Sequence, residues 1–117
     1  MSKKYTLELN HHFDASHQLE LDYLSPCQNC HGHRFSVRVK IVSSVLDRNG
    51  MIIDFQIIKN IINKLDHQHL NSILSFNPTA ENIAKYLQEE ISKKVLGEVE
   101  VTVWESPDAS ITYGEGE

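Results

Sequence analysis

Residues 33–41 read His-Arg-Phe-Ser-Val-Arg-Val-Lys-Ile, and their side chains alternate in character. The odd-numbered positions are mostly apolar, whereas the even-numbered positions are polar. Because successive side chains of a strand point to opposite faces of a sheet, this pattern is typical of a half-buried antiparallel strand. The stretch therefore predicts a sheet with a single buried face.

The rest of the chain adds three strands and two helices around this one. Asp54 is a good N-cap for the first helix, and residues 66–78 are polar and irregular. A loop is expected over residues 18–32. The order strand, strand, helix, helix, strand, strand predicts an α+β domain with both helices on one face of an antiparallel sheet. The expected strands cover residues 5–13, 33–41, 99–103 and about 110–113, and the helices cover 56–65 and from Pro78-Thr79 to near Gly97.

Composition narrows the possible functions. The chain has 117 residues without a visible repeat or linker, so we expect a single domain over residues 1–117. Eleven basic residues against 16 acidic ones, a net charge of -5, argue against nucleic acid as a partner. No run is long and apolar enough for a membrane span, and no signal-peptide core forms near the N-terminus. We therefore expect a cytoplasmic protein that has no membrane partner.

Histidine is the unusual residue type, with seven copies against two cysteines. His31 and His33 are two positions apart, so in extended backbone both imidazoles lie on one face. His17 closes the first strand and is expected to face the start of the second across a hairpin. Three neutral histidines with an open fourth position describe catalytic rather than structural zinc. Two surface histidines at a strand entrance are the simpler interpretation of the pair alone.

Cys27 and Cys30 are three positions apart. In a cytosolic chain this spacing indicates metal binding or redox chemistry. Together with His31 they also match the signature of covalent c-type haem attachment, which would require an exported chain and a further iron ligand. A structural zinc site of two cysteines and two histidines is another alternative. It is sterically awkward, because the adjacent Cys30 and His31 would point apart in extended backbone.

Two carboxylates occupy positions where they could take part in catalysis or substrate binding. Asp66 precedes His67, and such a carboxylate can orient an imidazole and raise its basicity. Glu105 ends a valine-rich strand, where it could bind a heterocycle that carries adjacent N–H donors. Taken alone, a solvated loop and an exposed glutamate are the simpler interpretations. No role is assigned to the remaining histidines, which are His11, His12 and His69.

Taken together, these pieces resemble the 6-pyruvoyl-tetrahydropterin synthase / 6-carboxy-tetrahydropterin synthase family. Each piece is weak alone, but six in the right order are a strong signal, and they cover most of the chain. The gap of four from Cys27 to His31 is similar to that of the bacterial queuosine-pathway branch. The matching pieces are Phe13-Asp14-Ala15-Ser16-His17, Cys27-x-x-x-His31-Gly32-His33, Gly50-Met51-Ile52-Ile53-Asp54-Phe55, Asp66-His67-x-x-Leu70-Asn71, Pro78-Thr79-Ala80-Glu81-Asn82 and Glu105.

The resemblance implies the tunnelling fold, or T-fold, in which ββααββ subunits join edge to edge into a barrel. It also implies a homohexamer, built as a dimer of trimers, with active sites at subunit interfaces. Closure of the barrel would remove strand edges that otherwise invite aggregation. The implied partner is a small pterin, 7,8-dihydroneopterin triphosphate, although the chain has few basic residues to bind a triphosphate.

The resemblance also implies roles for individual residues. Zn²⁺ would be the cofactor, held by three histidines, with Cys27 as general base. A relay would act on the other face of the substrate side chain. Cys30 is either a bystander, a partner in a reversible disulfide with Cys27, or a second thiol that shares the base role. The implied ligands are His17, His31 and His33, and the implied relay is Asp66 with His67.

In the same resemblance Glu105 anchors the pterin ring, and Thr79 from a neighbouring subunit is a weaker candidate for binding it. The implied reaction forms 6-carboxy-5,6,7,8-tetrahydropterin, acetaldehyde and triphosphate for queuosine biosynthesis. Two alternatives stay open. One is 6-pyruvoyl-tetrahydropterin synthase activity on the same substrate, and the other is a non-catalytic metal- or haem-binding module.

Overall fold

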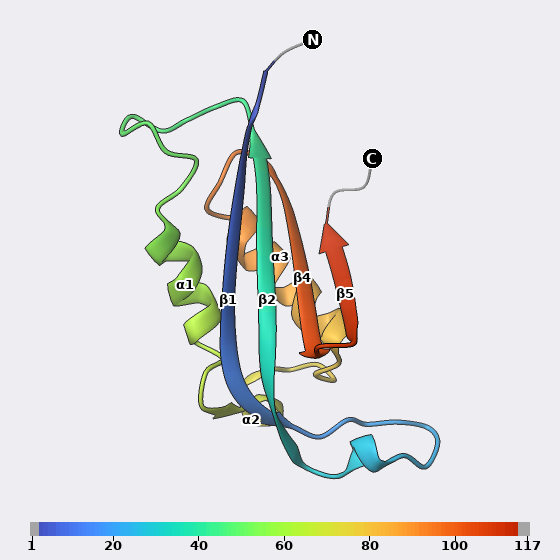
Figure 1. Cartoon of the computed structure of the whole chain (residues 1–117). Helices are drawn as coiled ribbons and strands as arrows, with labels where there is room; N and C mark the ends of the chain where they lie inside the picture. Colours follow the sequence, from blue (N-terminus) through green and yellow to red (C-terminus); the bar gives the residue numbers. More distant parts are fainter. Residues whose placement is uncertain (1–2, 115–117) are drawn as a thin grey trace.

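The computed structural model describes residues 3–114, except for the side chain of Cys27. A five-stranded sheet in the order β3-β1-β2-β4-β5 forms one layer, and the helices α1 and α3 lie against one of its faces (Figure 1). No helix in this part of the chain is long and apolar enough to cross a membrane. The strands are β1 (Tyr5–His17), β2 (His31–Ser43), β3 (Gln68–His69), β4 (Glu98–Ser106) and β5 (Ala109–Gly114), and the helices are α1 (Phe55–Asn63), α2 (Leu70–Ile73) and α3 (Ala80–Ser92), with a 3-10 turn at Pro26–Gln28.

The expected α+β class and the main order of elements are confirmed, with differences at the element ends. β1 continues to His17 and β2 begins at His31, because the two strands pair in one antiparallel register from Tyr5↔Ser43 to His17↔His31. The predicted loop is therefore two residues shorter, at 18–30. α1 spans Phe55–Asn63 rather than residues 56–65.

Residues 66–78 are not irregular throughout. They contain β3, which pairs in parallel with Ala15 and Ser16 of β1, and the short helix α2. A two-residue strand has no side-chain periodicity of its own, and it forms because β1 offers unpaired backbone groups beside it. This segment therefore ends up against the part of β1 that leads to His17.

The N-termini of α1 and α3 are capped by the side chains that precede them. The Asp54 carboxylate accepts a hydrogen bond from the backbone N–H of Gln56, as predicted. The Thr79 hydroxyl accepts one from the backbone N–H of Asn82 at the start of α3. Each cap satisfies a backbone donor that has no partner within its helix.

The core lies between the sheet and the two long helices. The predicted alternation in β2 is confirmed, because its buried side chains all face α1 and α3 while Arg34, Ser36, Arg38 and Lys40 are exposed. Removing these apolar side chains from water is the main favourable term in folding. The buried side chains of β2, α1 and α3 include Phe35, Val37, Val39, Ile41, Ile58, Ile61, Ile62, Ile83, Ala84, Leu87 and Ile91.

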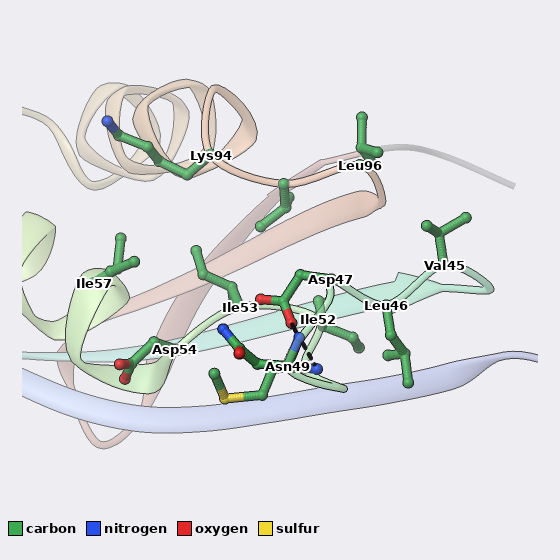
Figure 2. Close-up of a pocket in the computed structure, with 12 residues that line it drawn as sticks. Val45, Leu46, Asp47, Asn49, Ile52, Ile53, Asp54, Ile57, Lys94 and Leu96 are labelled. Carbon is green, nitrogen blue, oxygen red and sulfur yellow. Dashed lines mark hydrogen bonds between the residues drawn. The ribbon is translucent and has the colours of Figure 1, made fainter.

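A cavity of about 460 Å³ opens where residues 45–57 meet residues 94–96, at the end of the sheet opposite the loop 18–30 (Figures 1 and 2). Its walls are mostly aliphatic, and the loop on one side is held by Asp47, whose carboxylate accepts hydrogen bonds from the backbone N–H groups of Asn49 and Met51. None of the predicted site residues lines this cavity. The predicted site therefore has to be built at the other end of the sheet.

Candidate metal centre and adjoining cavities

The β1–β2 hairpin brings three histidines together. His17 pairs directly with His31 at the end of the hairpin, and His33 lies two residues further along β2 on the same face. One ring nitrogen from each histidine lies within 4.8 Å of the other two. The hairpin thus assembles the set that was expected from the sequence.

The environment of these nitrogens suits a metal ion. The side chain of His17 is fully buried, and the Nε2 atoms of His17 and His33 have no hydrogen-bond partner among the described residues. A buried nitrogen without a partner is costly, because it has lost its hydrogen bonds to water. Coordination of a metal would use these lone pairs, so the three imidazoles fit zinc.

Backbone carbonyls set the tautomers of two rings. The His17 Nδ1–H donates to the carbonyl oxygen of Pro78 at 2.7 Å, and the His31 Nδ1–H donates to that of Asn29 at 2.6 Å. A proton on Nδ1 leaves Nε2 as the lone-pair atom of each ring. Both rings therefore present the same atom to the cluster.

The surroundings of His33 favour the neutral form of its imidazole. Burial lowers the pKa of this imidazole, and the neighbouring His31 lowers it further by charge repulsion. Only neutral imidazole can bind a metal, since the protonated ring has no free lone pair. The site thus keeps His33 available as a ligand near neutral pH.

The Asp66–His67 pair is docked onto β1 through Asp14. The Asp66 Oδ1 atom accepts from the backbone N–H of Asp14 at 2.9 Å, and the backbone N–H of His67 donates to the Asp14 carbonyl at 2.7 Å. His67 has a φ of 56°, a left-handed conformation that costs a non-glycine residue about 1 kcal/mol. These bonds hold that backbone, and Asp66 Oδ2 lies 3.5 Å from His67 Nε2.

Arg34 stands beside this segment. Its guanidinium donates two hydrogen bonds to the Asp14 carboxylate, at 2.9 and 3.2 Å, and holds the pKa of that carboxyl below its usual value. Asp14, Arg34, His33 and His67 all line one cavity of about 510 Å³. The proposed metal ligand His33 and the exposed imidazole of His67 therefore line the same cavity.

Glu105 lies on the other side of the cluster. Its Oε1 atom is 3.9 Å from His17 Nε2, and its side chain is 32% exposed. Glu105 and Thr79 line a second cavity, of about 350 Å³, together with Leu19, Leu21 and Ile111. The structure thus places a carboxylate, apolar side chains and the proposed metal site within reach of one ligand.

The two cysteines belong to the loop that closes the hairpin. The backbone of Cys27 lies in the 3-10 turn Pro26–Gln28, but its side chain is outside the described residues, so its assignment as general base stays a prediction. Cys30 is an exposed free thiol whose Sγ atom lies 3.8 Å from His69 Nδ1. The same nitrogen is 2.8 Å from the hydroxyl of Ser16.

Sequence reasoning missed several of these contacts. His69, which had no evident partner, contacts Ser16 and Cys30, and the Nε2 atom of His11 is hydrogen bonded to Asn63. The carbonyl of Pro78 and the Asp14–Arg34 pair were also not foreseen. All of these contacts join residues distant along the chain, and local periodicity carries no signal for them.

Comparisons with known proteins show what the chain is similar to. A family model described as 6-pyruvoyl tetrahydropterin synthase matches residues 6–116. The chain is 31% identical over 106 residues to the dihydroneopterin monophosphate aldolase of Pyrococcus furiosus, covering 85% of this chain and 88% of that protein. It is 32% identical over 108 residues to the 6-carboxy-5,6,7,8-tetrahydropterin synthase of Rickettsia conorii, covering 72% and 78%.

Solved structures of 6-pyruvoyl tetrahydropterin synthases share the fold of this chain. The 6-pyruvoyl tetrahydropterin synthase of Caenorhabditis elegans superposes with a TM-score of 0.76 at 28% identity, covering 97% of each chain. That of Plasmodium vivax superposes with a TM-score of 0.72 at 17% identity, which supports the fold alone. The expected T-fold is thereby confirmed.

Proposed function

Because the chain belongs to the 6-pyruvoyl tetrahydropterin synthase family, we propose that it is a zinc-dependent 6-carboxy-5,6,7,8-tetrahydropterin synthase of queuosine (7-deazaguanine) biosynthesis. It would convert 7,8-dihydroneopterin triphosphate and water into 6-carboxytetrahydropterin, acetaldehyde and triphosphate. The observation that carries the proposal is the convergence of three imidazole nitrogens, two of them buried without a partner. We place this lyase in the cytoplasm, with a small pterin rather than nucleic acid or a membrane as its partner.

The chemistry is divided among the residues of the two cavities. Zinc held by His17, His31 and His33 would polarise the hydroxyls of the substrate side chain and acidify the neighbouring carbon-bound protons. Cys27 would remove a proton as general base. His67, oriented by Asp66, would exchange protons with the side chain from the cavity that it shares with His33.

The pterin ring would be bound in the second cavity. The Glu105 carboxylate can accept hydrogen bonds from the amino and N–H groups of the ring, and the aliphatic walls can pack against its faces. Thr79 lines the same cavity, but within this chain its hydroxyl already accepts a hydrogen bond from Asn82. We therefore keep Thr79 as a weaker candidate, which would act on the substrate of a neighbouring subunit.

The working enzyme would be a homohexamer, a dimer of trimers with active sites at the subunit interfaces. The sheet edges support this proposal. Within the described residues, β5 pairs on one side only, and β3 covers β1 only at Ala15 and Ser16. Unpaired edges of this kind pair with another strand, and edge-to-edge joining of subunits would close them.

The proposed activity is tested by product analysis. Incubation of the purified protein with zinc and 7,8-dihydroneopterin triphosphate is expected to release acetaldehyde and triphosphate and to form 6-carboxytetrahydropterin, which mass spectrometry identifies. Accumulation of a pyruvoyl pterin without acetaldehyde would instead assign the sister activity. Turnover of neither kind would refute the proposal.

An aldolase is the second candidate. The likeness to the Pyrococcus furiosus enzyme favours it. An aldolase acting on dihydroneopterin monophosphate would release a phosphorylated aldehyde in place of acetaldehyde. Running both substrates in the same product assay therefore separates the two candidates.

Replacing Glu105 by glutamine is expected to raise the KM for the pterin by about tenfold or more, because hydrogen bonds to a charged group contribute roughly 1.5–3 kcal/mol. The zinc content should stay unchanged, because the imidazoles are untouched. Steady-state kinetics and metal analysis of the same preparation check both points. Loss of zinc at an unchanged KM would show that Glu105 acts through its neighbour His17 instead.

A further inference from the structure

We propose that Asn71 and Asn77 are positioning residues, whose side-chain amides clamp the backbone between the metal centre and the second cavity. The inference rests on the proposed function, because that function makes the histidine cluster a metal site and the second cavity a pterin site. Neither asparagine is among the residues already assigned to the chemistry.

The clamp consists of four hydrogen bonds made by two side chains. The Asn71 Oδ1 atom accepts from the backbone N–H of Gln18 at 2.8 Å, and its Nδ2 donates to the carbonyl of Gln18 at 2.7 Å. Asn77 does the same with Glu20, at 2.9 Å in both directions. Each amide thus satisfies both main-chain groups of one residue, as a neighbouring strand would.

These bonds begin where the β-ladder ends. β1 and β2 separate after the pair His17↔His31, and β3 pairs with β1 only as far as Ser16. Gln18 and Glu20 follow at the next alternate positions, so Asn71 and Asn77 continue the side of β1 that β3 covers. Residues 18–20 are held in this way although no strand of residues 3–114 pairs with them.

The clamped segment, residues 18–20, connects the proposed metal centre to the second cavity. His17 precedes it, and Leu19, which lies between the two clamped residues, lines the cavity that contains Glu105. Asn77 is itself fixed, because it precedes Pro78, whose carbonyl orients His17, and its own carbonyl accepts from the side-chain amide of Asn82. A movement of Asn77 would therefore shift both the metal ligand His17 and the cavity-lining residue Leu19.

The loop needs such an anchor. Residues 18–30 join the strands, and long loops without an anchor take many conformations. Some other hydrogen bonds in the loop are internal, such as those from Gln28 Nε2 to the Leu21 carbonyl and from the Ser25 N–H to Gln28 Oε1. The far end of the loop is held separately, through Asn29 to His31 and Cys30 to His69. Internal bonds shape the loop without fixing it to the domain, whereas the two asparagines tie it to the chain around α2 and α3.

Hydrogen exchange and zinc binding test the clamp. In the double variant Asn71→Ala/Asn77→Ala, the amides of Gln18 and Glu20 are expected to exchange about tenfold faster or more, because each loses its acceptor. Zinc should bind about tenfold more weakly, in line with the usual effect of removing groups that orient a ligand. The KM for the pterin should rise as the position of Leu19 loosens.

Two further variants sharpen the result. Asn77→Asp keeps an acceptor for the Glu20 N–H but sets a carboxylate oxygen against the Glu20 carbonyl, so it should protect the Glu20 amide more than Asn77→Ala does and less than Asn77 does. Asn60→Ala removes an amide on α1 whose oxygen accepts only from Gln56 in the described structure, and it should change none of these readouts. A general loss of stability would instead raise exchange throughout the sheet, and that result would overturn the positioning role.

The outcomes separate this inference from the proposed function. Unchanged exchange of Gln18 and Glu20, or unchanged zinc affinity despite faster exchange, would overturn the clamp. Failure of the unaltered protein to bind zinc would overturn the proposed function and, with it, the metal-centre role of the clamp. The exchange of the two amides needs no metal and would still show whether the asparagines hold the segment.

Discussion

Replacement of His31 by alanine is expected to weaken zinc binding by about 100-fold or more. In structural zinc sites, four ligands together contribute about 10–16 kcal/mol, or roughly 3 kcal/mol each, and we expect the loss of one of the three imidazoles to cost a similar amount. His31 is the best position for this test because it is only partly buried, whereas the fully buried His17 also packs against Phe35. Competition with a chromophoric chelator measures the affinity, and acetaldehyde release should fall along with zinc occupancy.

His12→Ala is the matched control for this variant. His12 is an exposed histidine on β1, and its neighbours Phe13 and His11 point to the opposite face of the sheet. Its removal should leave zinc affinity unchanged. Retention of stoichiometric zinc by His31→Ala, with full acetaldehyde release, would show that the three imidazoles are not the metal site.

Replacement of Cys27 by alanine is expected to lower kcat by about 10²–10⁴-fold, the usual contribution of a positioned general acid or base. Zinc content should not change, because the thiol is not one of the proposed ligands. A normal melting temperature together with full zinc occupancy would show that the loss is chemical. Metal analysis and kinetics on one preparation make this measurement.

Cys30→Ala is the comparison for Cys27, because it removes the other thiol of the same loop. If the kcat falls in Cys30→Ala and not in Cys27→Ala, the base role belongs to Cys30, which lies 3.8 Å from His69. If both variants keep full activity, no cysteine serves as the base. Each result thus assigns the proton transfer to one thiol or to neither.

The strand positions are the part of the fold that could be predicted from the sequence. The alternation in residues 33–41 is a local pattern, and the sheet buries the side chains that the pattern marks. Helix caps are equally local, so Asp54 was found from its position before an apolar helical stripe. The ends of β1 and β2 were not found, because the pairing between them continues past the alternating residues.

In the candidate site, too, some features could be predicted from the local sequence and others depend on tertiary contacts. His31 and His33 are two apart in one strand, so the sequence places them on one face, and a hairpin brings His17 opposite. The contact of His69 with Ser16 and the docking of Asp66 on Asp14 depend instead on the two-residue strand β3. No periodicity marks so short an element, and tertiary pairing alone creates it.

By itself, the sequence determined which residue types this protein brings to its chemistry and the alternating stretches of β1 and β2, although His17 and His31 lie beyond the predicted ends of those strands. Both features follow from the residues and their spacing along the chain, because alternate residues of a β-strand lie on the same face of the sheet. Only the tertiary structure decided the tautomers of His17 and His31, the lowered pKa of His33 and the hydrogen bonds to Gln18 and Glu20. Those properties depend on burial and on hydrogen bonds, most of which join segments far apart in the chain.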